Sequence, residues 1–67
     1  MTFDIYDTNE QEYIDRDVPA QAITDVLVNA FCAFSDETLD VCRELGRAFN
    51  RNEDTSAYEA YLGVSIR

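Results

Sequence analysis

Fourteen Asp and Glu residues are the most numerous side chains in this 67-residue chain that could do chemistry, because paired carboxylates can act as general acid and base. A working pair needs a concave, partly dry pocket that separates the two pKa values, which a small helical domain rarely offers. The chain has no His for base or relay work, no lysine for a Schiff base, and no glycine loop for a phosphate. We therefore predict that the protein is not an enzyme and uses no cofactor.

Two short acidic stretches could begin a cation site. Asp7–Asn9 and Asp15–Asp17 are spaced like the start of a calcium-binding EF-hand loop, but both lack the later glycine and glutamate that such a loop needs. Cys32 and Cys42 cannot supply a four-ligand zinc site alone in a chain without His. We predict no metal site. We expect both thiols to pack in the core as small hydrophobic side chains, with a disulfide, or metal or redox chemistry, as the less favoured interpretations.

A row of arginines could bind an anion. Arg43, Arg47 and Arg51 are four residues apart and share one face of a predicted helix. Asp40 and Glu44 each precede one of them by three residues, and such pairs contribute only about 0.2–0.5 kcal/mol. A solvated, salt-bridged face is the first interpretation. The alternatives are the recognition helix of a helix-turn-helix-like DNA-binding regulator, and a contact with the acidic arm of a second subunit.

Negative charge is concentrated near the N-terminus. The first forty residues hold ten carboxylates and one base, Arg16, whereas the rest of the chain is neutral, so the formal net charge is −9. Solubility alone could explain this charge. Carboxylates interleaved with tyrosines also suit a basic protein surface, because the charges steer the encounter and the rings anchor it. The predicted partner-binding residues are Asp4, Tyr6, Asp7, Glu10, Glu12, Tyr13, Asp15 and Asp17. If the partner's basic surface normally holds nucleic acid, the protein would act as a nucleic-acid mimic.

The same charge argues against binding to a membrane surface and against direct nucleic-acid binding, because both partners are anionic. No apolar run approaches the ~20 residues that span a bilayer. The segment Met1–Asp4 lacks the basic and apolar regions of a secretion signal. We therefore expect a cytoplasmic protein.

A helical scaffold is predicted to position these side chains. Pro19 suits the first turn of a helix, and apolar residues then recur at spacings of three and four, which predicts a helix over residues 19–34. Ser35 suits an N-cap, and a second apolar stripe predicts a helix over 36–50. Gly46 would permit a close crossing of the two helices. The short joint between them predicts a helical hairpin or a helix-turn-helix corner.

The C-terminal and N-terminal segments carry different signals of secondary structure. Ser56 and Glu59 fit a capping box, and Gly63 suits a C-terminal cap, which predicts a short helix over 56–62. Alternating residues near the N-terminus are typical of a short strand, but no partner strand is evident. We therefore expect residues 1–17 to form an acidic arm or short helix.

The predicted fold is thus all-α, a single small domain over residues 1–67. A chain of this length buries only about 60% of the surface that its unfolded form exposes, so it is marginally stable alone. The chain is 46% apolar, and we predict no disulfide or metal that would add stability. Small domains of this kind commonly gain stability by self-association, so we predict a homodimer.

As a small, acidic, helical chain without enzymatic residues, the protein resembles the accessory proteins of temperate bacteriophages, including lambdoid early-region proteins and anti-CRISPR inhibitors. The stretch Ser56–Ser65 is similar to an acidic, tyrosine-containing stretch in one type I-F anti-CRISPR family. The resemblance implies a regulatory protein that binds a host or phage protein in the bacterial cytoplasm, as in host takeover. It carries over no functional residues.

Overall fold

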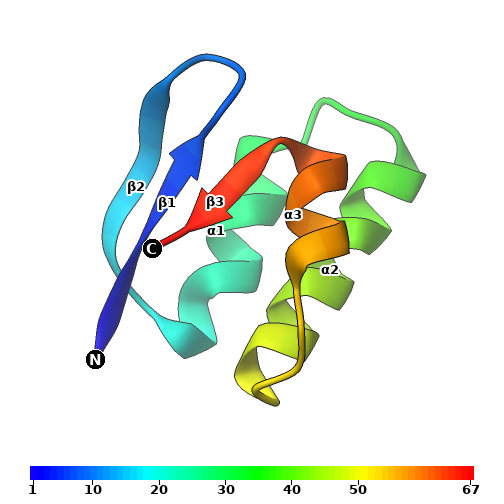
Figure 1. The fold of residues 1–67 in the computed structure, drawn as a ribbon. Coiled ribbons are helices and arrows are strands. Elements are labelled where there is room, and N and C mark those ends of the chain that lie inside the picture. The colour runs from blue at the N-terminus through cyan, green and yellow to red at the C-terminus, as the bar shows by residue number, and fades with distance from the viewer.

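The N-terminal third of the chain forms a β-hairpin. In the computed structural model, which describes residues 1–67, β1 (Thr2–Asp7) pairs antiparallel with β2 (Glu12–Pro19). The last strand, β3 (Val64–Ile66), pairs antiparallel with the other edge of β1, so the sheet order is β2-β1-β3 (Figure 1). The fold is therefore α+β, and the predicted all-α class is wrong. Residues 1–17 are neither a free arm nor a helix, because the missing partners of β1 are β2 and the distant C-terminal segment.

Two β-bulges hide β2 from a pattern search. Its register with β1 slips by one residue between the pairs Phe3–Val18 and Ile5–Asp15, and again before the next pair along the hairpin. Each extra residue reverses the inward and outward alternation that identifies a strand. At the first bulge Asp17 has a φ of 56°, and its backbone N–H donates to Asp4 Oδ1 at 3.0 Å. A side chain from β1 therefore stabilises the irregular backbone of β2.

The helices follow the hairpin and cover one face of the sheet (Figure 1). A 3-10 turn (Ala20–Ala22) leads into α1 (Ile23–Ala30), and α2 (Asp36–Asn50) and α3 (Ser56–Leu62) follow. The bounds predicted for the second and third helices are confirmed. The first helix is shorter than predicted at both ends. None of the three helices is long and apolar enough to cross a membrane.

The first helix begins late because Pro19 ends β2 instead of opening a helix. Its backbone is extended, with φ −69° and ψ 152°. At the other end, Phe31 and Phe34 lie beyond α1 in the connection to α2. The predicted helical hairpin is therefore corrected: α1 and α2 are consecutive helices packed on a sheet, and not a self-sufficient helical pair.

Side chains at the helix ends define where α2 and α3 begin. Ser35 Oγ accepts the backbone N–H of Thr38 at 3.3 Å, as an N-cap should. The predicted Ser56–Glu59 capping box is wrong, because Ser56 donates both its N–H and its hydroxyl to Asp54 Oδ1. These two hydrogen bonds hold the pKa of the Asp54 carboxyl below its ordinary value. Gly63 ends α3 in the left-handed conformation, with a φ of 72°, as predicted.

Glu59 joins α3 to β3. One of its carboxylate oxygens accepts the hydroxyl of Thr55, the N-cap residue, at 2.7 Å. The other accepts the backbone N–H of Ile66 at 2.8 Å. The backbone N–H of Ile66 in β3 therefore has a hydrogen-bond acceptor within the protein and does not depend on water for one.

The core lies between the sheet and the helices. Its buried residues come from all six main elements and the α1–α2 connection: Ile5, Val18, Ile23, Leu27, Phe31, Cys42, Leu45, Leu62 and Val64. Cys42 is fully buried, as predicted, and burial raises the pKa of its thiol. Cys32 is exposed, so the expectation of two buried thiols is wrong for this residue. It follows the end of α1, where the chain turns away from the core.

Candidate protein-binding site

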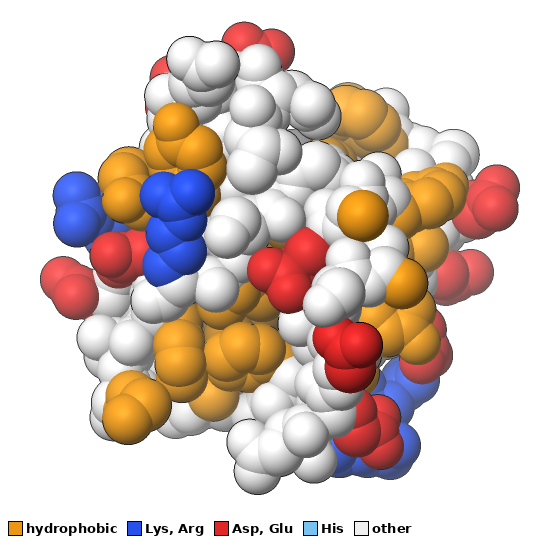
Figure 2. All heavy atoms as spheres, viewed as in Figure 1, with side chains coloured by type: hydrophobic (Ala, Val, Ile, Leu, Met, Phe, Trp, Pro, Cys, Tyr) orange, Lys and Arg blue, Asp and Glu red, His pale blue; other side chains and the backbone are white.

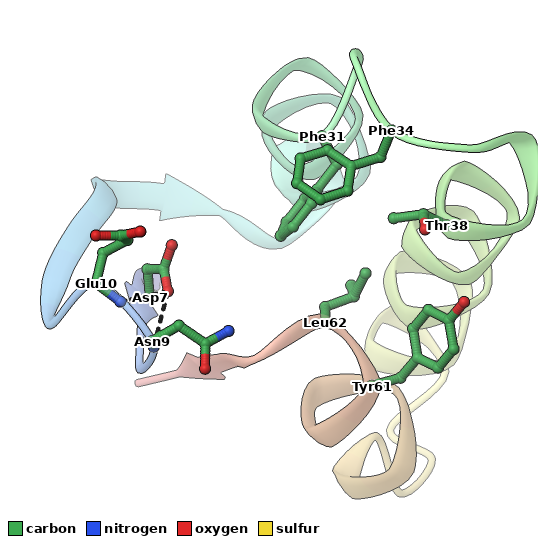
Figure 3. A pocket seen from close by; sticks show the side chains of 8 residues that line it. All are labelled: Asp7, Asn9, Glu10, Phe31, Phe34, Thr38, Tyr61 and Leu62. Carbon is green, nitrogen blue, oxygen red and sulfur yellow. Dashed lines mark hydrogen bonds between the residues drawn. The ribbon is translucent and has the colours of Figure 1, made fainter.

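The β1–β2 turn is held rigidly against the end of α3. Asp7 Oδ1 accepts the backbone N–H groups of Asn9 and Glu10 at 2.9 and 3.1 Å, which closes the turn (Figure 3). Thr8 donates both its N–H and its hydroxyl to the carbonyl oxygen of Gly63, each at 2.9 Å. The acidic turn therefore keeps a fixed position relative to the last turn of α3.

This turn also explains the acidic stretch Asp7–Asn9. The spacing that begins a cation loop here serves a side chain that caps its own turn. No three Asp, Glu or Cys side chains in the chain are grouped so that they could hold a metal ion. The stretch Asp15–Asp17 lies at the bulge in β2, where Asp15 Oδ1 accepts the N–H of Arg16 at 2.8 Å.

A cleft of about 390 Å³ opens between the turn and the helices. One wall carries acidic and amide side chains from the turn, and the opposite walls carry aromatic and aliphatic side chains from the α1–α2 connection and α3 (Figure 3). The lining residues are Asp7, Asn9, Glu10, Phe31, Phe34, Thr38, Tyr61 and Leu62. Four are apolar or aromatic and two are carboxylates, a mixture that suits a ligand with both an apolar and a cationic part.

The aromatic wall is unusually open to solvent. Phe34 is 60% exposed and Tyr61 is 54% exposed, and these are two of the four large hydrophobic residues that the whole chain exposes. The rings of Phe34 and Phe31 meet edge to face with centroids 5.2 Å apart, so buried Phe31 supports the exposed ring. Exposed aromatic rings gathered in one hollow mark an interaction surface more often than isolated ones do.

The uncovered face of the sheet carries a second aromatic group. Tyr6 and Tyr13 are opposite each other across the hairpin and meet edge to face at 5.0 Å. Arg67 lies over the ring of Tyr6 at 4.2 Å, and Arg16 lies over the ring of Tyr13 at 4.4 Å. Arg16 also reaches Asp4 at 3.5 Å. Both rings therefore already have cation partners from within the chain.

The structure divides the predicted partner-binding residues between these places. Asp7 and Glu10 line the cleft, whereas Asp4, Tyr6 and Tyr13 belong to the uncovered sheet face. The others follow β2: Glu12 is opposite Asp7 in the ladder, and Asp15 and Asp17 lie at the bulge. The structure therefore distributes the acidic segment over the cleft, the uncovered sheet face and the edge strand β2.

Two residues of the cleft escape sequence reasoning. The predicted helix over 19–34 places Phe34 in an apolar stripe, and the predicted short helix over 56–62 includes Tyr61 without giving it a binding role. The available signal was weak. Leu62 continues the buried face of α3, and Tyr61, its neighbour, cannot share that face fully.

Arg43 and Arg47 lie on α2, whereas Arg51 is the C-cap residue just beyond its end; two members of the row are paired. Arg43 bonds to Asp40 at 3.0 Å, and Arg47 bonds to Glu44. Arg51 has no ion-pair partner. The row borders a shallow hollow, whose other lining residues are Gln21, Thr24, Gly46 and Asn50. The salt-bridged face that was the first interpretation is thus present.

Unpaired negative charge dominates the molecular surface. Three of the fourteen carboxylates form ion pairs, and the other eleven have no basic partner within 4.0 Å. Figure 2 shows acidic side chains at many points of one view of the molecule and basic side chains in two separate groups. Comparisons with models of known protein families, with curated proteins and with solved structures found no match.

Proposed function

We propose that this chain is a non-enzymatic interaction protein whose acidic hairpin binds a basic surface on a protein partner. The observation that carries the proposal is the density of unpaired carboxylates on the hairpin, namely Asp7, Glu10, Glu12, Asp15 and Asp17. The assignment to the accessory proteins of temperate phages rests only on the resemblance described above. A partner that normally holds nucleic acid would make the chain a competitor by charge.

The pairing of Asp7 with Glu12 supports this reading of the hairpin. These two carboxylates are directly opposite each other in the β1–β2 ladder. Like charges directly opposite each other destabilise a sheet. A cationic group from a partner would remove the repulsion, so binding would recover stability that the free hairpin lacks.

The proposal is tested by affinity capture from nuclease-treated bacterial lysate, with elution by a salt gradient and identification by mass spectrometry. The hairpin variant Asp7→Asn/Glu10→Gln/Glu12→Gln removes three charges, and the asparagine keeps an oxygen for the turn. The control Asp25→Asn/Glu37→Gln/Glu53→Gln removes three exposed, unpaired charges elsewhere. We expect wild type and control to retain one protein that salt releases, and the hairpin variant to lose it.

Two results would contradict the proposal. Equal loss in both variants would show that total charge, and not the hairpin, attracts the partner. Capture of DNA when nuclease is omitted, abolished by alanine at Arg43, Arg47 and Arg51, would favour the regulator that binds DNA through α2.

Homodimerisation is a separate proposal. It is supported by the limited burial in this small chain, in which twelve of the 67 residues are buried. Light scattering at micromolar concentration tests it, and a monomer mass would refute it.

A further inference from the structure

We propose that the cleft beside the β1–β2 turn receives an arginine side chain from the basic partner, with the guanidinium group between the carboxylates of Asp7 and Glu10 and the rings of Phe34 and Tyr61. This inference rests on the proposed function and specifies its chemistry.

The acidic wall of the cleft has carboxylate oxygens that accept no hydrogen bond within the chain. Asp7 uses Oδ1 to close the turn, and Oδ2 makes no hydrogen bond within the chain. The Glu10 side chain makes neither a hydrogen bond nor an ion pair, although its backbone N–H is bonded to Asp7. Two carboxylates with free oxygens in one hollow repel each other, and a cation placed between them removes that repulsion.

The aromatic wall selects the shape of the cation. Guanidinium is planar, delocalised and weakly hydrated, so it lies well against a ring while its N–H groups reach carboxylates at its edge. A lysine ammonium is a compact, strongly hydrated charge and gains less from the rings. A purely apolar side chain would remove water from Asp7 and Glu10 without replacing their hydrogen bonds. An anion would meet two negative charges.

The two walls are preorganised relative to each other. The double hydrogen bond from Thr8 to the Gly63 carbonyl joins the acidic turn to the end of α3, two residues beyond Tyr61. Phe34 is braced by the buried ring of Phe31. The volume of about 390 Å³ falls within the range of about 300–1,000 Å³ typical of ligand sites, so a long side chain can enter.

The same chemistry is absent from the other aromatic group. On the uncovered sheet face, Arg16 and Arg67 already lie over the rings of Tyr13 and Tyr6. A cation from a partner would have to displace one from the chain itself. The cleft, in contrast, has exposed rings and free carboxylates with no basic side chain among its lining residues.

The probes are hexaarginine and hexalysine peptides of equal length and charge, titrated against the full chain by fluorescence anisotropy. We expect hexaarginine to bind more tightly. Replacing Tyr61 or Phe34 by Ala leaves the net charge unchanged and should weaken hexaarginine binding about two- to fivefold, the effect of losing an exposed cation–π contact. Gln21→Ala is the control, because Gln21 is exposed and uncharged and lies outside both the cleft and the hairpin. It should leave the affinity unchanged.

The outcomes separate this inference from the proposed function. Equal affinity for the two peptides, or an unchanged affinity in both Phe34→Ala and Tyr61→Ala, overturns the arginine site. If Asp7→Asn/Glu10→Gln/Glu12→Gln still weakens binding in that case, the acidic hairpin survives as a binding surface. If that triple variant also binds normally, both proposals fail. Phe34 and Tyr61 are largely exposed, and a native-like amide spectrum of each variant confirms that it is folded.

Discussion

Gly46 determines how closely α2 approaches the start of α1. An added Cβ at this position would lie 1.7 Å from Thr24 Oγ1 and 2.9 Å from Thr24 Cβ. Both contacts are too short for real atoms, so the helices would have to separate. The sequence signal was correct here, since a glycine in the middle of a strong helix costs stability unless a close contact needs it.

We therefore expect Gly46→Ala to destabilise the protein by about 1–3 kcal/mol, as overpacking does, although alanine favours helices by about 1 kcal/mol. Urea unfolding measures the change. Adding Thr24→Ala removes the nearest atom and should recover part of the loss. A more stable Gly46→Ala protein would show that the two helices do not touch at this point.

The two cysteines should differ sharply in reactivity. Cys42 is fully buried, and burial raises its pKa, so both access and the thiolate fraction are reduced. Cys32 is exposed. We expect a thiol reagent such as Ellman's reagent to modify one thiol quickly in the native protein and the second only after unfolding. Cys32→Ser should abolish the fast phase and Cys42→Ser should leave it intact; the reverse pattern would contradict the fold around α2.

At the scale of elements, the start of α3 links stability to pH. The Asp54 carboxylate accepts two hydrogen bonds from Ser56, which lower its pKa relative to the unfolded chain. The stabilisation that the Asp54 carboxylate gives to the folded protein is therefore fully present above the pKa of Asp54 in the unfolded chain. It is lost as the pH falls through the lower pKa of Asp54 in the folded protein.

Asp54→Ala should accordingly reduce the free energy of unfolding near neutral pH, and the difference from wild type should shrink as the solution is acidified below the ordinary Asp pKa of 3.8. Urea unfolding at a series of pH values measures this trend. Glu53→Ala is the control, because Glu53 is an adjacent exposed carboxylate whose side chain forms no hydrogen bond. A difference that stays constant with pH would contradict the assigned role of Asp54.

The elements differ in how far sequence alone predicts them. Helix α2 has a cap, an apolar stripe and enough length, so its local signals agree with its packing. The strands have no such agreement. β2 breaks its alternation twice, carries Asp15–Asp17 on an edge, and includes a residue with positive φ. β3 is three residues long, so its identity depends on a pairing with β1 about sixty residues away, which no local pattern reports.

At the scale of the whole molecule, net charge works against compactness. A net charge of −9 is held within a body about 30 × 24 × 18 Å in extent. The Debye length is about 30 Å at 0.01 M salt, so these charges repel one another across the molecule, whereas at 0.1 M it falls to about 10 Å and the repulsion is largely screened.

We expect the thermal midpoint to rise as NaCl is added from low ionic strength, and calorimetry or circular dichroism can follow it. The variant Asp7→Asn/Glu10→Gln/Glu12→Gln, with three fewer negative charges, should show a smaller rise. A midpoint that falls with added salt would mean that ion pairs, and not repulsion, dominate the electrostatic energy.

Sequence alone predicted the acidic residues of the candidate site but not its aromatic residues, because the site depends on how the whole molecule is folded. Charge density alone selects Asp7 and Glu10. Their aromatic counterparts, Phe34 and Tyr61, come from distant segments that meet only after the sheet has placed the hairpin beside α3. A site formed by contact between separate elements cannot be found before their arrangement is known.

The central position of β1 has a consequence for the order of synthesis. Its first partner, β2, follows it at once, but its second partner is residues 64–66. As the chain leaves the ribosome, the hairpin can form early, yet one edge of β1 stays open until those residues are made. Closing a pair so distant in sequence is slow compared with forming a hairpin. The nascent protein therefore exposes an unpaired strand edge beside Ile5, and electrostatic repulsion between chains of net charge −9 opposes edge-to-edge pairing in that interval.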